Sequence, residues 1–443
     1  MQRAVVMGGS YAGLFAARVL SEHAEEVVVV EPDAIGEDGL GRRTPQRRQL
    51  HALLSMGHRR LERWFPGLTD ELVKGGARLG EGEDVRFYVD GRLKAPVAES
   101  RMLGATRPFL ESRLRSRVER LATVRFVRAE VTDLLLRGER VAGVVTTAPG
   151  ADPAEGRPAG EELTADLVVD ATGRNSRLGE WLTRHGWDEA PVDRMRIDLG
   201  YATASFQRGG ELGSTVIAHS SPGPASDYRA EVTEPGALAA VEGERWSVVL
   251  AGYADYRPGP DPDEFLRRMR RCVEPIRTVA EEATMIEDVV TYRFVESRRR
   301  VHSRLRRFPG GLVVVGDALA SVNPVYGQGL TLAALEADAL AAYLRTAPGP
   351  HAPALGYFRL AEAAVDAAWQ LSTAADLAQP HVTGPYPRGY RAQKWVADRL
   401  TEASVRDSDV NAAYMRVVNM EDPPKALTDP RLLARAARVL LRG

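Results

Sequence analysis

The 443-residue sequence contains a single cysteine, no charge excess and no long apolar run. One cysteine, Cys272, excludes an internal disulfide and a thiolate metal cluster, so we expect no metal site and a reducing, cytoplasmic location. A formal net charge of -1 gives no general attraction for nucleic acid. No apolar run reaches the roughly 18 residues of a membrane span, so we expect neither membrane contact nor a signal peptide.

Residues 4–20 combine an apolar run, a glycine-rich turn and an alanine-rich segment. Ala4 to Met7 has the length of a buried parallel strand, and Leu14 to Leu20 has the composition of a helix packed on it. Gly8 and Gly13 bracket the turn and direct its backbone N–H groups, with the helix N-terminus, at a diphosphate. Ser10 replaces the middle glycine of the dinucleotide fingerprint, so a phosphate-free turn is the alternative. We call residues 8–13 the first glycine turn.

The next apolar run, Val27 to Val30, ends in Glu31. A carboxylate about twenty residues beyond such a turn can accept hydrogen bonds from both hydroxyls of a ribose. It also disfavours a 2'-phosphate, so we expect FAD or NAD rather than NADP.

An arginine-rich loop and a predicted helix follow. The arginines Arg42, Arg43, Arg47 and Arg48 can line a phosphate or a cofactor edge, although a solvated loop explains them equally well. From Gln49 to Trp64, apolar residues recur at helical spacing. His51 lies on or next to the buried face of this predicted helix, and we assign it no chemistry.

The middle of the chain predicts two further groups of strands. Val85 to Val97 indicates a hairpin turned at Asp90 and Gly91 that joins a second sheet, and Arg107 opens a helix after it. A β-meander then favours the FAD variant of the dinucleotide fold over a dehydrogenase. The predicted strands before the substrate region are 124–128, 131–136, 141–147 and 163–170, with a dispensable loop at 149–160. Those of a mostly antiparallel substrate sheet are 197–206, 215–219, 228–233, 246–253 and 288–294, with helices at 262–272 and 275–283.

A second strand, glycine-rich turn and helix occupy residues 311–344. Asp317, directly after the strand, can bind ribityl or ribose hydroxyls. The N–H groups of residues 327–330 form a positive helix end that would stabilise the negative charge of a reduced isoalloxazine. Taken alone, this segment is equally well an ordinary strand-to-helix connection. We call residues 316–329 the second glycine turn.

Together these motifs resemble the FAD-dependent monooxygenases of the p-hydroxybenzoate hydroxylase superfold. The resemblance rests on GGSYAG with Glu31, on Arg107, on DATGRNS from Asp170 and on GDALASVNPVYGQG from Gly316. Within that group, GGSYAG, PQRRQLHALL and NPVYGQG are most similar to actinobacterial epoxidases of polyether biosynthesis and to squalene epoxidase.

The resemblance implies an α/β fold with a Rossmann-type FAD-binding domain, an antiparallel-sheet substrate domain and a helical C-terminal region. The expected FAD-binding domain comprises residues 1–80, 101–185 and 300–345. The substrate domain comprises residues 81–100 and 186–299, and the helical region comprises residues 346–443. The implied FAD-binding residues are Gly8, Ser10, Gly13, Glu31, Arg43, Arg107, Val131, Asp317, Pro324, Gly327, Gln328 and Gly329.

The resemblance also implies a C4a-hydroperoxyflavin as oxygen donor. No second nucleotide turn is visible, so NAD(P)H would bind transiently, or a partner flavin reductase would supply reduced flavin. The expected substrate is an apolar small molecule of secondary metabolism, including antibiotic biosynthesis. Because no local acid-base pair stands out, we favour olefin epoxidation. Tyr201, Tyr253 and Tyr292 are weak candidates for a base, since any strand of the substrate sheet could supply one. We favour the explanation that they are simply buried tyrosines of that sheet.

Four other functions compete with epoxidation. An aromatic hydroxylase shares the superfold, and a geranylgeranyl-type reductase would reduce olefins without oxygen. A flavin-dependent halogenase is disfavoured by the absence of a W-x-W-x-I-P motif. A non-catalytic flavin-binding protein is the fourth alternative.

The last segment, Arg431 to Arg442, predicts a basic amphipathic helix. Such a helix can lie on a membrane or contact a partner. We favour packing of its leucine and valine stripe on the protein itself.

Overall fold

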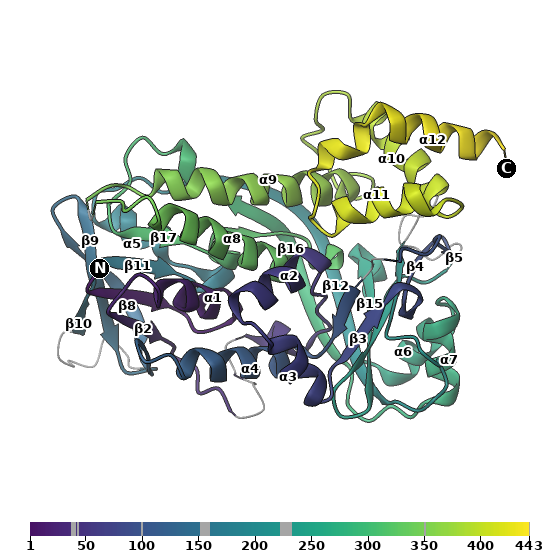
Figure 1. Ribbon diagram of the computed structural model, residues 1–443, viewed down its shortest axis with the longest axis horizontal. Coiled ribbons are helices and arrows are strands. Elements are labelled where there is room, and N and C mark those ends of the chain that lie inside the picture. Colours follow the sequence, from purple (N-terminus) through teal and green to yellow (C-terminus); the bar gives the residue numbers. More distant parts are fainter. Residues whose placement is uncertain are drawn as a thin grey trace.

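A five-stranded parallel sheet occupies one half of the molecule (Figure 1, left). The computed structural model describes residues 1–36, 41, 44–98, 101–150, 160–221, 233–349 and 351–442. In spatial order the strands are β17 (Leu312–Val314), β11 (Leu167–Asp170), β1 (Arg3–Met7), β2 (Glu26–Val30) and β7 (Val124–Val127). The central strands are runs of valine and other apolar residues buried on both faces, as parallel strands covered by helices require.

Helices pack on this sheet and bring the two glycine turns together. These helices are α1 (Tyr11–Leu20), α2 (Ser55–Trp64), α3 (Leu68–Lys74), α4 (Arg107–Glu119), α5 (Leu178–Arg184) and α8 (Gly329–Leu344). A methyl group on Gly57 of α2 would lie 2.4 Å from Thr331 Oγ1 of α8, so these helices cross at close range. Two small sheets accompany them: β3 (Arg78–Glu81) with β6 (Arg101–Gly104), and β8 (Glu130–Arg137), β9 (Arg140–Thr147) and β10 (Glu161–Thr164).

The second large sheet has eight strands and is antiparallel except for the parallel pair of β13 with β4. In spatial order it contains β18 (Ala320–Ser321), β16 (Val290–Arg300), β12 (Val192–Gln207), β15 (Arg245–Tyr253), β14 (Gly236–Val241), β13 (Ile217–Ser221), β4 (Val85–Val89) and β5 (Arg92–Leu93). Helices α6 (Pro262–Met269) and α7 (Glu274–Glu282) cover one face with Phe265, Met269 and Ile276. The opposite face lines a cavity.

The C-terminal region is helical (Figure 1, yellow). The long α9 (Leu355–Asp376) runs over the molecule, and α10 (Tyr390–Ser404), α11 (Ser408–Val418) and α12 (Pro430–Leu441) gather beyond its end. Leu432, Leu433, Val439 and Leu440 of α12 pack against α10 and α11 in one apolar cluster, as the amphipathic pattern predicts. None of the helices in the described part of the chain combines the length and hydropathy needed to cross a bilayer.

The sequence-based expectations of fold class are confirmed, with local corrections. The helix predicted from Gln49 begins only at Ser55, because the Gln49 amide donates to Val290 O (3.0 Å) and accepts from Thr203 Oγ1 (2.6 Å). These bonds hold residues 49–54 extended against the sheet. The run 163–170 is two strands, β10 and β11, rather than one. Strand β14 was not predicted; most of the strand expected at 228–233, and most of the loop at 149–160, lie outside the described residues.

Candidate active site

The first glycine turn has no space for side chains at its two outer glycines. Gly8 adopts a φ of +102°, which L residues rarely adopt. A Cβ on Gly13 would lie 1.9 Å from the carbonyl oxygen of Gly8. The strand and α1 therefore approach closely enough to leave the helix N-terminus open toward the cavity.

Glu31 closes one side of this turn. Its Oε2 accepts a hydrogen bond from Gly9 N (2.7 Å), and its Oε1 accepts one from Asp33 N (2.8 Å). A carboxylate has about four acceptor positions, so Glu31, which lines the cavity, retains capacity for ribose hydroxyls.

Glu111 of α4 organises the other side of the turn. This buried carboxylate accepts hydrogen bonds from Ser10 Oγ (2.9 Å), Arg107 Nε (2.8 Å) and Arg47 Nε (2.8 Å). Burial alone would raise the pKa of Glu111, but the Arg107 and Arg47 guanidiniums lower it to about 2. The ionised Glu111 thereby orients Arg107, whose terminal nitrogens point toward Ser10 and His51. Sequence reasoning missed Glu111, although its spacing of four residues after Arg107 on one helix was a signal.

His51 lies in the cavity rather than in a core. Arg107 Nη1 can only donate, so His51 Nε2 accepts at 3.0 Å, and Nδ1 carries the proton that it donates to Gln49 O (2.8 Å). Burial and the charge of Arg107 lower the pKa of His51 to about 3. The imidazole is therefore neutral and has no free acceptor nitrogen.

The second glycine turn lies directly against the first. Gly316 has a φ of +63°, and a Cβ there would lie 2.7 Å from the Cβ of Ala12 at the start of α1. The backbone N–H of Gly316 donates to the buried Glu336 carboxyl. Burial raises the pKa of Glu336 to about 8. Burial also raises the pKa of Asp317, against the opposing charges of Arg107 and Arg174.

A buried polar network holds the rest of this turn against α9. Asp376 Oδ1 accepts hydrogen bonds from Asn323 Nδ2 (2.7 Å) and Tyr326 OH (3.1 Å), and Asn323 Nδ2 also donates to Tyr253 OH (2.9 Å). Burial raises the pKa of Asp376 to about 7, although these hydrogen bonds oppose the shift. Asp376 Oδ2 has no partner among the described residues. No sequence pattern connects Asp376 with the turn about 50 residues earlier.

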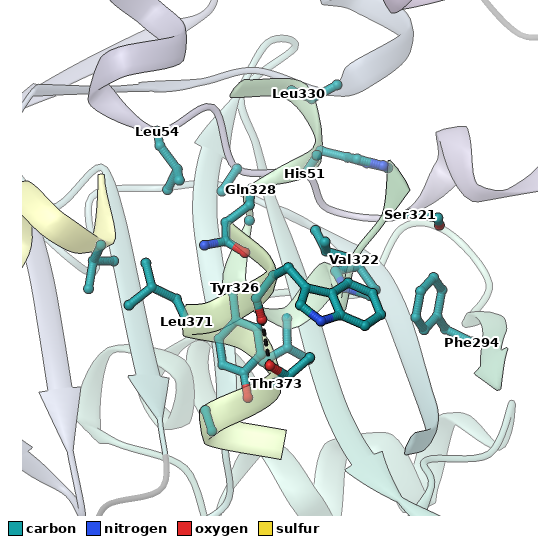
Figure 2. Close-up of a pocket in the computed structure, with 18 of the residues that line it drawn as sticks. His51, Leu54, Phe294, Ser321, Val322, Tyr326, Gln328, Leu330, Leu371 and Thr373 are labelled. Atoms are coloured by element: carbon teal, nitrogen blue, oxygen red, sulfur yellow. Dashed lines mark hydrogen bonds between the residues drawn. The ribbon is translucent and has the colours of Figure 1, made fainter. Parts of the chain in front are cut away.

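One cavity of about 2390 Å³ joins both turns to the open face of the eight-stranded sheet and to helices α9, α10 and α11. Figure 2 shows Tyr326 and Gln328 of the second glycine turn facing Leu371 and Thr373 of α9, with His51 and Leu54 at the opposite wall. Tyr201 and Tyr292 also line the cavity, whereas Tyr253 belongs to the Asp376 network. Burial raises the pKa of Tyr201 and of Tyr292.

Ten of the predicted cofactor residues line this cavity. They are Gly8, Ser10, Glu31, Arg107, Val131, Asp317, Pro324, Gly327, Gln328 and Gly329. Gly13 lies behind the wall, where α1 meets the first turn, and Arg43 lies outside the described residues. Contact of each with FAD stays a prediction. Within the described ranges, no three His, Cys, Asp or Glu side chains are grouped to hold a metal ion.

Comparisons with known proteins agree with this geometry. Residues 1–354 match a family model described as an FAD binding domain. Protein Rv3254 from Mycobacterium tuberculosis (strain ATCC 25618 / H37Rv) is 33% identical over 456 residues, covering 99% of this chain and 94% of that protein.

Two solved structures show the same fold at low sequence identity. The p-nitrophenol 4-monooxygenase PnpA from Pseudomonas putida DLL-E4 has a TM-score of 0.67 at 18% identity, covering 97% of this chain and 100% of that one. The flavin-dependent brominase Bmp2 has a TM-score of 0.61 at 14% identity, covering 99% of this chain and 98% of that one. The fold is thus that of flavin monooxygenases and halogenases.

Proposed function

Because the chain belongs to the FAD-binding domain family, we propose that it is an FAD-dependent monooxygenase that epoxidises an apolar olefin of secondary metabolism. The observation that carries this proposal is the single cavity that joins both glycine turns to the sheet and to α9. A cofactor held at the turns and a substrate held on the sheet would share that space. The sequence resemblance to actinobacterial epoxidases supports the choice of olefin chemistry.

The residues at the turns fit FAD. The close contact of Gly13 with Gly8 leaves a side-chain-free cradle for a diphosphate, and Arg107 offers two terminal nitrogens beside it. Glu31 suits ribose hydroxyls, Asp317 suits ribityl hydroxyls, and the N-terminus of α8 suits the negative edge of a reduced isoalloxazine. Bound FAD supplies the electrons that activate O2, and the chain orients both reactants and excludes water.

Three ionisable groups that line the cavity favour epoxidation over phenol hydroxylation. Hydroxylation of a phenol requires a base that removes the phenolic proton. Tyr201 and Tyr292 have raised pKa values and stay protonated, and His51 has no free acceptor nitrogen. Among the described residues, these three are therefore poor bases, whereas olefin attack needs only placement and a dry pocket.

The electron source is proposed to be NAD(P)H that binds transiently, or reduced flavin from a partner reductase. The overall reaction then balances as one olefin, one O2, one NAD(P)H and one proton giving one epoxide, one water and one NAD(P)+. One oxygen atom of O2 enters the carbon–carbon double bond and the other leaves as water.

Oxygen-18 labelling tests the proposal. Reconstituted holoprotein is supplied with oxygen-18 gas, NADPH or NADH, a flavin reductase, bromide, and the probes squalene, farnesol and 4-nitrophenol. We expect an olefin epoxide that carries one oxygen-18 atom, formed only when reductant is present. A parallel reaction in oxygen-18 water is the control and should give no label.

Other products would overturn epoxidation. Labelled 4-nitrophenol products alone would indicate an aromatic hydroxylase, and a brominated product would indicate a halogenase. A saturated olefin without label would indicate a reductase. Bound FAD that is never reoxidised by O2 would overturn oxygenation altogether.

A further inference from the structure

A buried lysine stands at the end of the cavity remote from the glycine turns. Lys94 follows β5, is 8% exposed and lines the cavity wall. Lysine is rarely this buried without a partner. Among the described residues, no carboxylate forms an ion pair with Lys94, and burial lowers its pKa to about 7. With this pKa the amine is only partly protonated at neutral pH, and an anion bound beside it would favour the charged ammonium.

The position of Lys94 is fixed by backbone contacts on both sides. Its N–H donates to Phe87 O of β4 (2.9 Å), and the next N–H, of Ala95, donates to Ser404 O at the end of α10 (3.1 Å). Asn411 Nδ2 of α11 donates to Ala95 O (2.5 Å). In Figure 1 the α10–α11 pair accordingly lies next to β4 and β5. Lys94 is thus built into the junction of the sheet with the C-terminal helices.

The groups around the Lys94 ammonium suit an anion. Lys94 Nζ lies 3.9 Å from the ring centre of Tyr414 of α11, a cation–π contact that holds the ammonium without neutralising it. His219 of β13 also lines this end of the cavity, and burial together with the charge of Lys94 lowers its pKa to about 4. A neutral imidazole has one N–H to donate. Two donors therefore flank the space, and neither has a described anionic partner.

The subsite lies far from the flavin end. In the eight-stranded sheet, β15, β14 and β13 lie between β12, which carries Tyr201, and β4. Lys94 continues β5, one strand beyond β4, so five steps of about 4.8 Å between neighbouring strands place it about 24 Å from β12 along the sheet. Only an elongated molecule can reach Lys94 while its reacting double bond lies at the glycine turns.

We propose that Lys94, flanked by His219 and Tyr414, binds an anionic oxygen group, such as a carboxylate, at the far end of a long apolar substrate. The inference deepens the proposed function and rests on it for the orientation of the substrate. The charge would select acids over the corresponding esters and would set which double bond lies beside the flavin.

Probe binding to the FAD-loaded protein without reductant tests the subsite. The probes are cis-parinaric acid, a fluorescent polyene acid, and its methyl ester. We expect wild-type protein to bind the acid at least about tenfold more tightly than the ester. Lys94→Met should weaken acid binding by about tenfold to a hundredfold and leave ester binding within about threefold. Lys94→Arg keeps the charge and should retain part of the preference.

A matched control is Lys394, which also lines the cavity but is paired with Asp398 at 2.7 Å. Lys394→Met should leave the preference for acid unchanged. Equal binding of acid and ester by wild-type protein, failure of the acid to bind, or equal loss in both lysine variants would overturn the subsite.

The two proposals fail separately. Wild-type protein that inserts oxygen-18 but shows no preference for the acid would overturn the subsite alone. A Lys94-dependent acid preference without oxygen-18 insertion would overturn the monooxygenase proposal alone.

Discussion

The two glycine turns shift the pKa values of their buried acids in opposite directions. At the first turn, Glu111 is ionised, with a pKa lowered to about 2 by Arg107 and Arg47. At the second turn, Glu336 and Asp376 are equally buried, but burial raises their pKa values to about 8 and about 7. The difference comes from the partners, because guanidiniums face Glu111, whereas backbone, amide and phenol donors face the other two acids.

This contrast suits two different tasks. An ionised Glu111 holds two guanidiniums beside a cradle shaped for a diphosphate, so the arginines are oriented before a ligand arrives. A protonated Glu336 under the second turn adds no negative charge beneath the helix end that would face a reduced flavin. The same residue type thus positions cations at one turn and only supports backbone at the other.

The largest expected effect comes from the different room for an added side chain at the two turns. Gly13→Ala forces a methyl group against the Gly8 carbonyl oxygen. We expect this variant to lose more than about 4 kcal/mol of stability and to lose FAD binding as well. Gly329→Ala is the matched change at the second turn, where no atom lies within 4 Å of the added Cβ. It should leave the apoprotein melting temperature unchanged and weaken FAD binding by about tenfold, since the methyl enters the cavity.

Thermal melts of the apoproteins, with FAD titrations of both variants, check this prediction. If Gly13→Ala and Gly329→Ala lowered the melting temperature equally, the two turns would not differ in their room for a side chain, and the prediction would be wrong.

The next effect separates the turns by charge. Glu111→Gln removes the carboxylate between Arg107 and Arg47 and leaves Arg47 only the more distant Asp33 (3.9 Å), so it should cost about 3–5 kcal/mol at pH 7. Glu336→Gln replaces an acid that is neutral in the folded protein at pH 7 but ionised in the unfolded chain, so we expect the variant to be at least as stable as wild type. Urea denaturation at pH 7 measures both. A Glu336→Gln variant as unstable as Glu111→Gln would contradict the assignment of opposite protonation states.

Acid titration gives the same contrast in a single variant. Because the pKa of Glu111 falls from 4.5 to about 2 on folding, it contributes about 3 kcal/mol above pH 4.5. That contribution is lost as the pH falls toward 2. The Glu111→Gln variant should therefore lose less stability than wild type between pH 5 and pH 3. Urea midpoints of both proteins across this pH range measure the difference. An unchanged pH profile would mean that Glu111 is not the ionised partner.

The last contrast concerns Asp376, and its size depends on pH. Its pKa rises from 3.8 to about 7 on folding, so wild-type stability should fall as the pH rises between these values and then level off. Asp376→Asn mimics the protonated acid and should change stability at pH 4 by less than about 1 kcal/mol, because the acid is then protonated in the folded wild type and about half protonated in the unfolded chain. At pH 8 it should be more stable than wild type. Urea midpoints at the two pH values measure this, and a variant with the wild-type slope would refute the assignment.

Several features were readable from sequence because their signals are local. The valine runs, the spacing of Gly8 and Gly13 and the position of Glu31 predicted a nucleotide-binding unit, and GDALASVNPVYGQG predicted its counterpart. The helix expected from Gln49 to Trp64 exists, but its expected start was wrong, because hydrogen bonds of Gln49 to Thr203 and Val290 on the sheet override local periodicity. The domain boundaries and the individual FAD contacts stay predictions.

The sequence by itself determined the fold class and the FAD-binding family, because strands, turns and helix starts follow from residues close together in the chain. Only the tertiary structure decided which acids are ionised and where a free cation faces the cavity. Glu111 meets Ser10 across 101 residues, and Asn411 fixes the Lys94 segment across 316. Protonation depends on burial and on partners, and both are set by packing between segments whose separation no local pattern encodes.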